Sequence, residues 1–77
     1  MAHDYEWNHE SFASQKAAVR AYLNQGNTLT ALEALRMFGT LRLSAIIFDL
    51  REEGIKIDMK RIKTDSGKWV GEYRISE

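Results

Sequence analysis

The chain has 77 residues, eleven basic and eleven acidic side chains, and no cysteine. This length allows one domain with a thin core and no enzyme-sized pocket, and the missing cysteines exclude disulfides and thiolate metal sites. The longest purely apolar run, residues 45–48, is too short for a membrane span or a secretory signal, so we expect a cytoplasmic protein.

Charge is distributed unevenly along this neutral chain. Residues 1–10 hold three acidic residues and no lysine or arginine, and they lack periodicity. We therefore expect a flexible acidic tail there, followed by one domain over 11–77. Residues 56–68 hold five basic and two acidic residues, a local charge of +3. Zero net charge argues against a strongly basic nucleic-acid binder, but this late segment suits an anionic partner.

The first predicted helix covers residues 12–25, with Ser11 as its N-cap and Gly26 as its stop. Its apolar stripe recurs at helical spacing and consists of Phe12, either Ala18 or Val19, Tyr22 and Leu23.

A short extended link, residues 27–29, leads to a second predicted helix over 31–38. Thr30 and Glu33 have the spacing of a capping box at its start. Leu32, Leu35 and Phe38 are expected to face the core.

A third predicted helix covers residues 41–53 and is closed by Gly54. Thr40 is its expected cap, and its buried seam contains Leu43, Ile47 and Leu50 at i, i+4 and i+7. Because little more than Gly39 separates it from the second helix, the two helices must cross steeply.

Residues 55–60 and 68–75 alternate between apolar and polar side chains and predict two strands joined by the turn 65–67, with Gly67 left-handed. Placing Thr64 opposite Lys68 sets the register. The resulting pairs are Lys60–Glu72, Asp58–Arg74, Met59–Tyr73, Ile57–Ile75, Ile62–Val70 and Lys63–Trp69.

Three helices followed by a C-terminal hairpin predict an α+β fold, the winged helix-turn-helix. The stretch 30–57, TALEALRMFGTLRLSAIIFDLREEGIKI, resembles the small helix-turn-helix domain proteins of bacteriophages and prophages. The matching residues are Leu32-Glu33-Ala34, Phe38-Gly39, Arg42-Leu43, Asp49-Leu50-Arg51, Gly54 and Ile57. The resemblance implies a winged-helix fold and DNA binding. This sequence departs from the family pattern at Ile46, where the pattern often has a basic residue.

The first functional hypothesis is duplex DNA binding by a phage or prophage regulator, as a homodimer or in tandem. The third helix would enter the major groove, with Arg42 in its first turn reading guanine, and the hairpin would hold phosphates. The candidate residues are Arg36, Thr40, Arg42, Ser44, Ala45, Arg51, Arg61, Lys63, Lys68 and Trp69. Three alternatives stay open. Thr40 can serve as a cap alone, Arg42 can pair with Glu33 or Asp49, and Trp69 can plug the space between the hairpin and the first helix.

The second hypothesis is a protein-binding adaptor or inhibitor of a host or phage protein. The helical seam already uses three residues, so apolar surface is expected to be left over for a partner, and the alternative is that a helix packed from two sides buries a wide arc. The candidate contacts are Ile46, Phe48, Ile62 and Val70. His3 and His9 match no metal-ligand spacing, and no catalytic constellation is present, so we expect no enzyme, metal, cofactor, membrane or small-molecule substrate.

Overall fold

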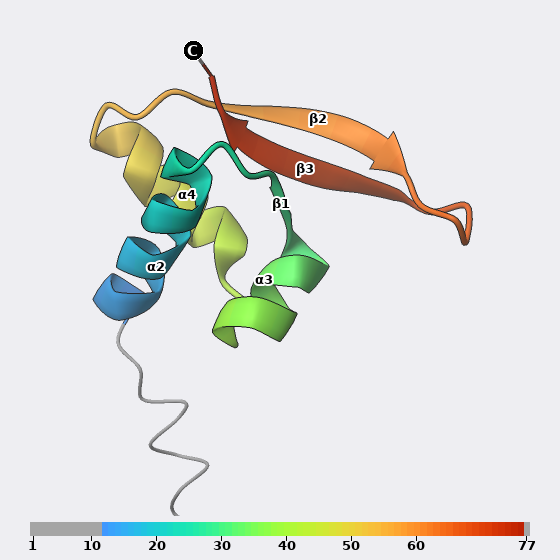
Figure 1. The fold of residues 1–77 in the computed structure, drawn as a ribbon, viewed down its shortest axis with the longest axis horizontal. Coiled ribbons are helices and arrows are strands. Elements are labelled where there is room, and N and C mark those ends of the chain that lie inside the picture. Colours follow the sequence, from blue (N-terminus) through green and yellow to red (C-terminus); the bar gives the residue numbers. More distant parts are fainter. Residues whose placement is uncertain (1–11, 77) are drawn as a thin grey trace, which may run out of the picture.

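A computed structural model describes residues 12–76, in which three helices precede an antiparallel hairpin (Figure 1). The helices are α2 (Phe12–Asn24), α3 (Ala31–Phe38) and α4 (Leu43–Glu52), and the strands are β1 (Leu29–Thr30), β2 (Ile57–Lys63) and β3 (Trp69–Ile75). The predicted order of elements is therefore confirmed. The predicted tail lies outside the described residues. Among the described helices, none is long and apolar enough to cross a membrane.

The hairpin has the register that the sequence predicts. All six predicted pairs are present, from Ile57 opposite Ile75 to Lys63 opposite Trp69. The backbone N–H of Thr64 donates to the carbonyl of Lys68 at 2.7 Å, and Gly67 has a φ of +87° in the turn. Period-two alternation and turn length are sufficient to set this register, because a one-residue slip would exchange the two faces.

A third strand, β1, is the element that the sequence analysis missed. Leu29 pairs with Tyr73 and Thr30 with Glu72, so the sheet order is β1-β3-β2. A strand of two residues is too short to show apolar–polar alternation, so the sequence predicted only an extended link over residues 27–29 and no strand. The strand anchors the start of α3 to the sheet.

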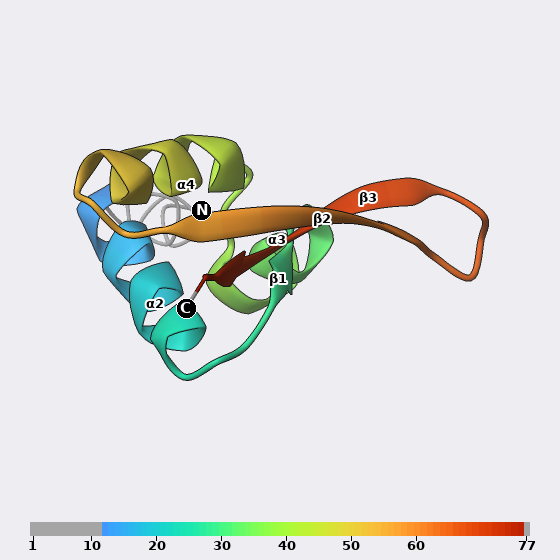
Figure 2. The ribbon, with the colours of Figure 1, turned by 90° about the horizontal axis from the view of Figure 1, so that it is seen from above.

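The core lies where α2, α4 and the base of the sheet meet (Figure 2). Its buried apolar residues are Val19, Leu23, Leu29, Ala34, Leu43, Ile46, Ile47, Leu50 and Ile57. The predicted seam of the third helix is confirmed, and Val19 rather than Ala18 completes the stripe of α2.

The core-facing side of α3 was predicted incorrectly. Leu32 is 55% exposed and Leu35 is 38% exposed, whereas Ala34 is buried and Phe38 packs half-buried against the core. The ring of Phe38 makes an edge contact with Tyr22 of α2, with centroids 5.7 Å apart. Because Ala34 and Phe38 are four residues apart, they define the packed side of this short helix and leave the two leucines outside.

The capping box of α3 is confirmed. The Thr30 hydroxyl accepts from the N–H of Glu33 at 3.2 Å, and the Glu33 carboxylate accepts from the N–H of Thr30 at 2.9 Å. Gly39 closes the helix with a φ of +66°, a conformation that favours glycine. These local signals explain why the boundaries of this helix match the prediction.

Charged side chains join α2 to α4 at the surface. The ammonium of Lys16 and the guanidinium of Arg20 both contact the Glu53 carboxylate, and Lys16 also lies 3.8 Å from Asp49. The hydrogen bond from Lys16, reinforced by the charge of Arg20, holds the pKa of Glu53 below its ordinary value of 4.5. Asp49 is thus paired with a lysine of α2 and not with Arg42, which was one of the alternatives left open by the sequence.

Candidate functional site

The two faces of the β2–β3 hairpin differ in charge. Side chains alternate between faces along each strand. The Trp69 face carries Ile57, Met59, Arg61 and Lys63 of β2 opposite Ile75, Tyr73, Gly71 and Trp69 of β3. The Val70 face carries Asp58, Lys60 and Ile62 of β2 opposite Arg74, Glu72 and Val70 of β3.

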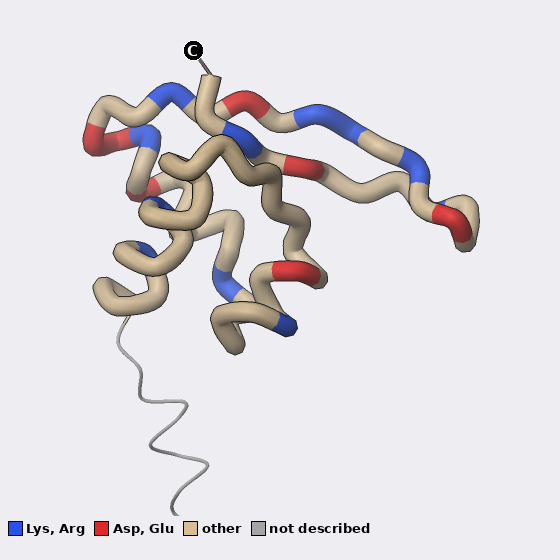
Figure 3. The backbone as a smooth tube through the Cα atoms, in the orientation of Figure 1, with Lys and Arg blue, Asp and Glu red and all other residues tan. Residues whose placement is uncertain are grey.

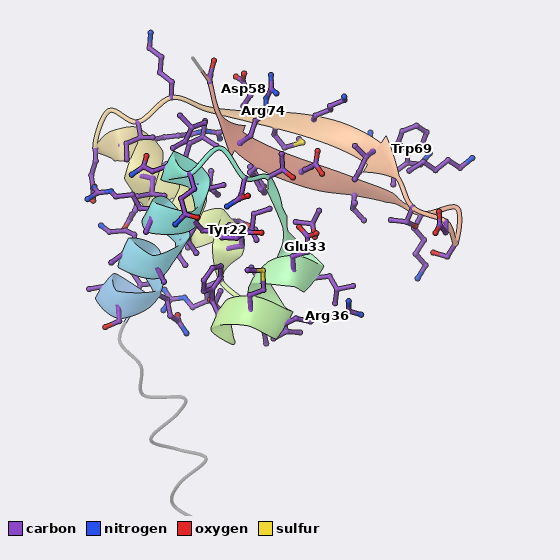
Figure 4. All side chains as sticks on the ribbon, viewed as in Figure 1. Tyr22, Glu33, Arg36, Asp58, Trp69 and Arg74 are labelled. Carbon is purple, nitrogen blue, oxygen red and sulfur yellow. The ribbon has the colours of Figure 1, made fainter. Side chains whose placement is uncertain are left out.

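Opposite charges face each other on the Val70 face only. Asp58 lies across from Arg74, and the two side chains lie side by side in Figure 4. Lys60 likewise lies across from Glu72. On the Trp69 face, by contrast, the two cations oppose a glycine and a tryptophan. This face therefore carries two cations and no acidic residue of β2 or β3.

The hairpin extends beyond the helices, and its faces turn along its length. At its base, the Trp69 face contributes the buried Ile57 to the core. Near its end, Ile62 and Val70 of the opposite face line a groove with Leu32 of α3. The right-handed twist of the strands accounts for this exchange, because it rotates the hairpin so that a different face is turned toward the helices at its base and near its end. Trp69 is thereby left at the projecting end, pointing away from the helices (Figure 4).

Trp69 forms a cation–aromatic cluster with the neighbouring strand. The guanidinium carbon of Arg61 lies 5.7 Å from its ring centroid and the ammonium of Lys63 lies 5.9 Å away. The tryptophan is 57% exposed, so it is not the plug between hairpin and first helix that remained an alternative. Exposed cations beside an open aromatic ring suit contact with nucleic acid.

Lys68 lies next to this cluster and is exposed in the turn that closes the hairpin. Figure 3 shows basic segments recurring along β2 up to that turn. Among the described residues, the ion pairs found all involve Lys16 or Arg20 of α2. Arg61, Lys63 and Lys68, which have no acidic residue opposite them on the hairpin, are therefore available to an external anion.

The start of α4 differs from the prediction. The helix begins at Leu43 rather than at residue 41, so Arg42 occupies the N-cap position and not the first turn. Its guanidinium carbon lies 4.5 Å from the ring centroid of Phe12, not beside Glu33 or Asp49. Ser44 is exposed and Ala45 is half-buried in the first turn of the helix. The guanidinium of Arg42 is thus held against α2, and the prediction that these residues contact DNA stays a prediction.

Thr40 is a correction to the candidate DNA contacts. It is only 2% exposed, and its hydroxyl accepts from the backbone N–H of Arg42 at 3.0 Å. It therefore shapes the turn before α4 and presents no side chain to a partner. The prediction that Thr40 caps the helix is wrong, because the N-cap residue is Arg42 and the Thr40 hydroxyl binds the backbone of that residue.

The other two predicted arginines have different surroundings. Arg36 is exposed and points outward from α3 (Figure 4). Arg51 donates from Nε and Nη2 to the carbonyl of Ile57, at 3.2 and 2.8 Å. Arg51 therefore connects the end of α4 to the beginning of β2, a structural contact that the sequence analysis did not foresee.

The candidate apolar contacts divide into buried and accessible residues. Ile46 is 0% exposed, so the expectation that it remains at the surface is wrong: α4 buries a wider arc than the three-residue seam. Phe48 is 62% exposed. Ile62 and Val70 are half-buried and line a groove of about 300 Å³. Its other lining residues are Thr30, Ala31, Leu32, Glu33, Arg36, Thr64 and Gly71.

Three residues near the candidate contacts were missed. Phe12 lies beneath the guanidinium of Arg42, and only the packing of α2 against the turn reveals this contact. Met59 and Gly71 share the Trp69 face, and a Cβ on Gly71 would lie 3.1 Å from the sulfur of Met59. The predicted register already placed both residues beside the cluster, so this signal was available in the sequence.

Three helices followed by an antiparallel hairpin with exposed cations define the winged class of helix-turn-helix proteins, in which the hairpin is the wing. The chain belongs to the winged helix-turn-helix domain family, whose profile matches residues 14–77. Domains of this class typically bind DNA and are not catalytic. Comparison with curated proteins and with solved structures finds no significant match.

Proposed function

We propose that this chain binds duplex DNA, with the start of α4 toward the major groove and the wing on the phosphate backbone. Arg42, Ser44 and Ala45 are the contacts proposed near the bases, and Arg36 is a proposed phosphate contact on α3. The phosphate contacts of the wing are Arg61, Lys63 and Lys68, with Trp69 beside them. We further propose a role as a transcriptional regulator or accessory DNA-binding factor of a phage or prophage.

The observation that carries the proposal is the charge of the Trp69 face. The neutral chain concentrates Arg61 and Lys63 on one side of a projecting hairpin whose two strands have no acidic residue on that side. Phosphate contacts supply most non-specific affinity for DNA, so a local surface of this kind matters more than net charge. Arg51 contributes less, because its guanidinium already binds the Ile57 carbonyl.

Two lysines of β2 provide a matched test. Lys63 lies on the Trp69 face, and Lys60 lies on the other face opposite Glu72. In fluorescence anisotropy with a labelled random-sequence duplex, Lys63→Ala is expected to weaken binding and reduce the log–log salt slope by about 0.9. Lys60→Ala is expected to leave the slope unchanged. Equal effects of the two variants, or wild-type affinity that does not respond to salt, would contradict the proposal.

A protein contact is a second candidate, and the groove between α3 and the wing favours it. Leu32, Ile62 and Val70 line this groove with apolar side chains. A second copy of the chain is the proposed occupant, because a single small module buries only about 600–1,000 Å² on DNA and a dimer engages two half-sites.

Solution mass measured by light scattering tests this candidate. The wild type is expected to have twice the chain mass of 8.9 kDa, and Ile62→Glu is expected to have the mass of one chain. Phe48→Ser is the control outside the groove and is expected to remain dimeric. A wild type with the mass of a single chain at every concentration used for DNA binding would exclude the homodimer.

A further inference from the structure

Trp69 offers an open aromatic surface at a place where the core does not need one. It lies at the first position of β3, beyond the helices, with 57% of its surface exposed. A hollow of about 190 Å³, lined by Arg61 and Trp69, lies against it. A tryptophan used only for packing would be covered, so this position suggests a ligand that contacts the ring.

The neighbours of Trp69 restrict the chemistry of that ligand. Arg61 and Lys63 lie within 6 Å of the ring, at 5.7 and 5.9 Å, and repel any cationic group. Gly71, next on the same face, contributes no side chain, and Met59 occupies the space above it. The site therefore combines a half-exposed apolar ring with two flexible, exposed cations that lie over it. A planar ring attached to an anionic backbone matches both features.

We propose that the Trp69 site stacks an unpaired base of DNA while Arg61 and Lys63 hold the adjoining phosphates. The proposal rests on the DNA-binding function above and specifies what the wing recognises. Bases inside a duplex have both faces covered by their neighbours, so away from the duplex ends only an unpaired base offers a ring to the indole. Stacking on aromatic side chains is tolerant of sequence, because every base has such a face. The preferred DNA is thus a duplex with a single-stranded extension.

Tryptophan fluorescence reports this contact directly. The chain has two tryptophans, so Trp7→Phe leaves Trp69 as the only source of tryptophan emission. In this background, a duplex with a four-thymidine overhang is expected to quench the emission and to bind roughly tenfold more tightly than the blunt duplex. The blunt duplex is expected to leave the emission nearly unchanged.

Trp69→Leu supplies the matched variant, because it keeps an apolar side chain and removes the ring. Measured by anisotropy, it is expected to bind both DNAs with the affinity that the parent has for the blunt duplex. Circular dichroism checks that the fold is retained. Trp69→Phe, which keeps a ring, is expected to recover part of the preference.

The outcomes separate this inference from the proposed function. Equal affinity for the overhang and blunt DNAs, with no quenching by either, would overturn the stacking proposal and leave duplex binding intact. Binding of neither DNA would overturn both. A preference for the overhang DNA that persists in Trp69→Leu would also refute the stacking proposal, because the ring would then have no part in recognition.

Discussion

Two neighbouring apolar side chains of α4 have opposite surroundings, and this difference determines what each can do. Ile46 is fully buried, whereas Phe48 is 62% exposed. In sequence they look equivalent, since each flanks the predicted seam. Only the packing of α2 and α3 on the helix assigns one to the core and leaves the other to the surface.

Denaturant unfolding of α4 variants tests this assignment. Ile46→Val is expected to lower the free energy of unfolding by about 0.5–1.5 kcal/mol, and Ile46→Ala by about 2–5 kcal/mol, because each leaves a cavity in a small core. Phe48→Ala is expected to stay within about 0.5 kcal/mol of the wild type. A larger loss for Phe48→Ala than for Ile46→Val would contradict the burial described for α4.

The predicted functions of Thr40 and Arg42 depended on the exact residue at which α4 begins. Thr40 was a plausible cap in sequence, but the helix begins at Leu43, and the hydroxyl of Thr40 holds the turn instead. Arg42 stacks on Phe12, which lies 30 positions earlier in the chain. Local propensity does not report a contact of that kind, because it arises when α2 packs against the turn.

Elements with strong local signals were predicted well, and those defined by long-range pairing were not. The boundaries of α3 follow from its capping box and Gly39, and the hairpin register follows from alternation and turn length. β1 has only two residues and exists because Leu29 and Thr30 reach β3. Its pairing helps to fix α3 so that Ala34, and not Leu32, faces the core.

The ion pairs between α2 and α4 make the packing of these helices dependent on pH. Because the pKa of Glu53 is lowered in the folded state, its contribution to stability is present above its ordinary value of 4.5 and is lost as the pH falls through the lowered value. Glu53→Gln is therefore expected to reduce the Tm at neutral pH and to match the wild type in strong acid.

Thermal unfolding followed by circular dichroism across this pH range measures the difference. Glu52→Gln is the control, because it removes the same charge from the neighbouring residue, which makes none of the ion pairs found in residues 12–76. A Tm difference for Glu53→Gln that stays constant from neutral to acid pH would exclude a role for the Glu53 carboxylate charge.

At the scale of the whole molecule, a thin core supports a wing that extends beyond it. The buried residues come from all three helices and from the base of the sheet, whereas the end of the wing contributes none of the core residues found among residues 12–76. The projecting part is thus free to carry charge and an exposed ring with no loss of core packing. Duplex contact and base stacking are both proposed for this part of the fold.

The sequence by itself determined the order of elements, the capping box, the hairpin register and the uneven charge of the wing, because each depends on residues close together in the chain or on simple periodicity. Only the tertiary structure decided which side of α3 is packed, that Ile46 and Thr40 are buried, and that Trp69 is open. Those outcomes depend on how elements far apart in the chain cover one another, and the spacing of residues along a single element does not contain that information.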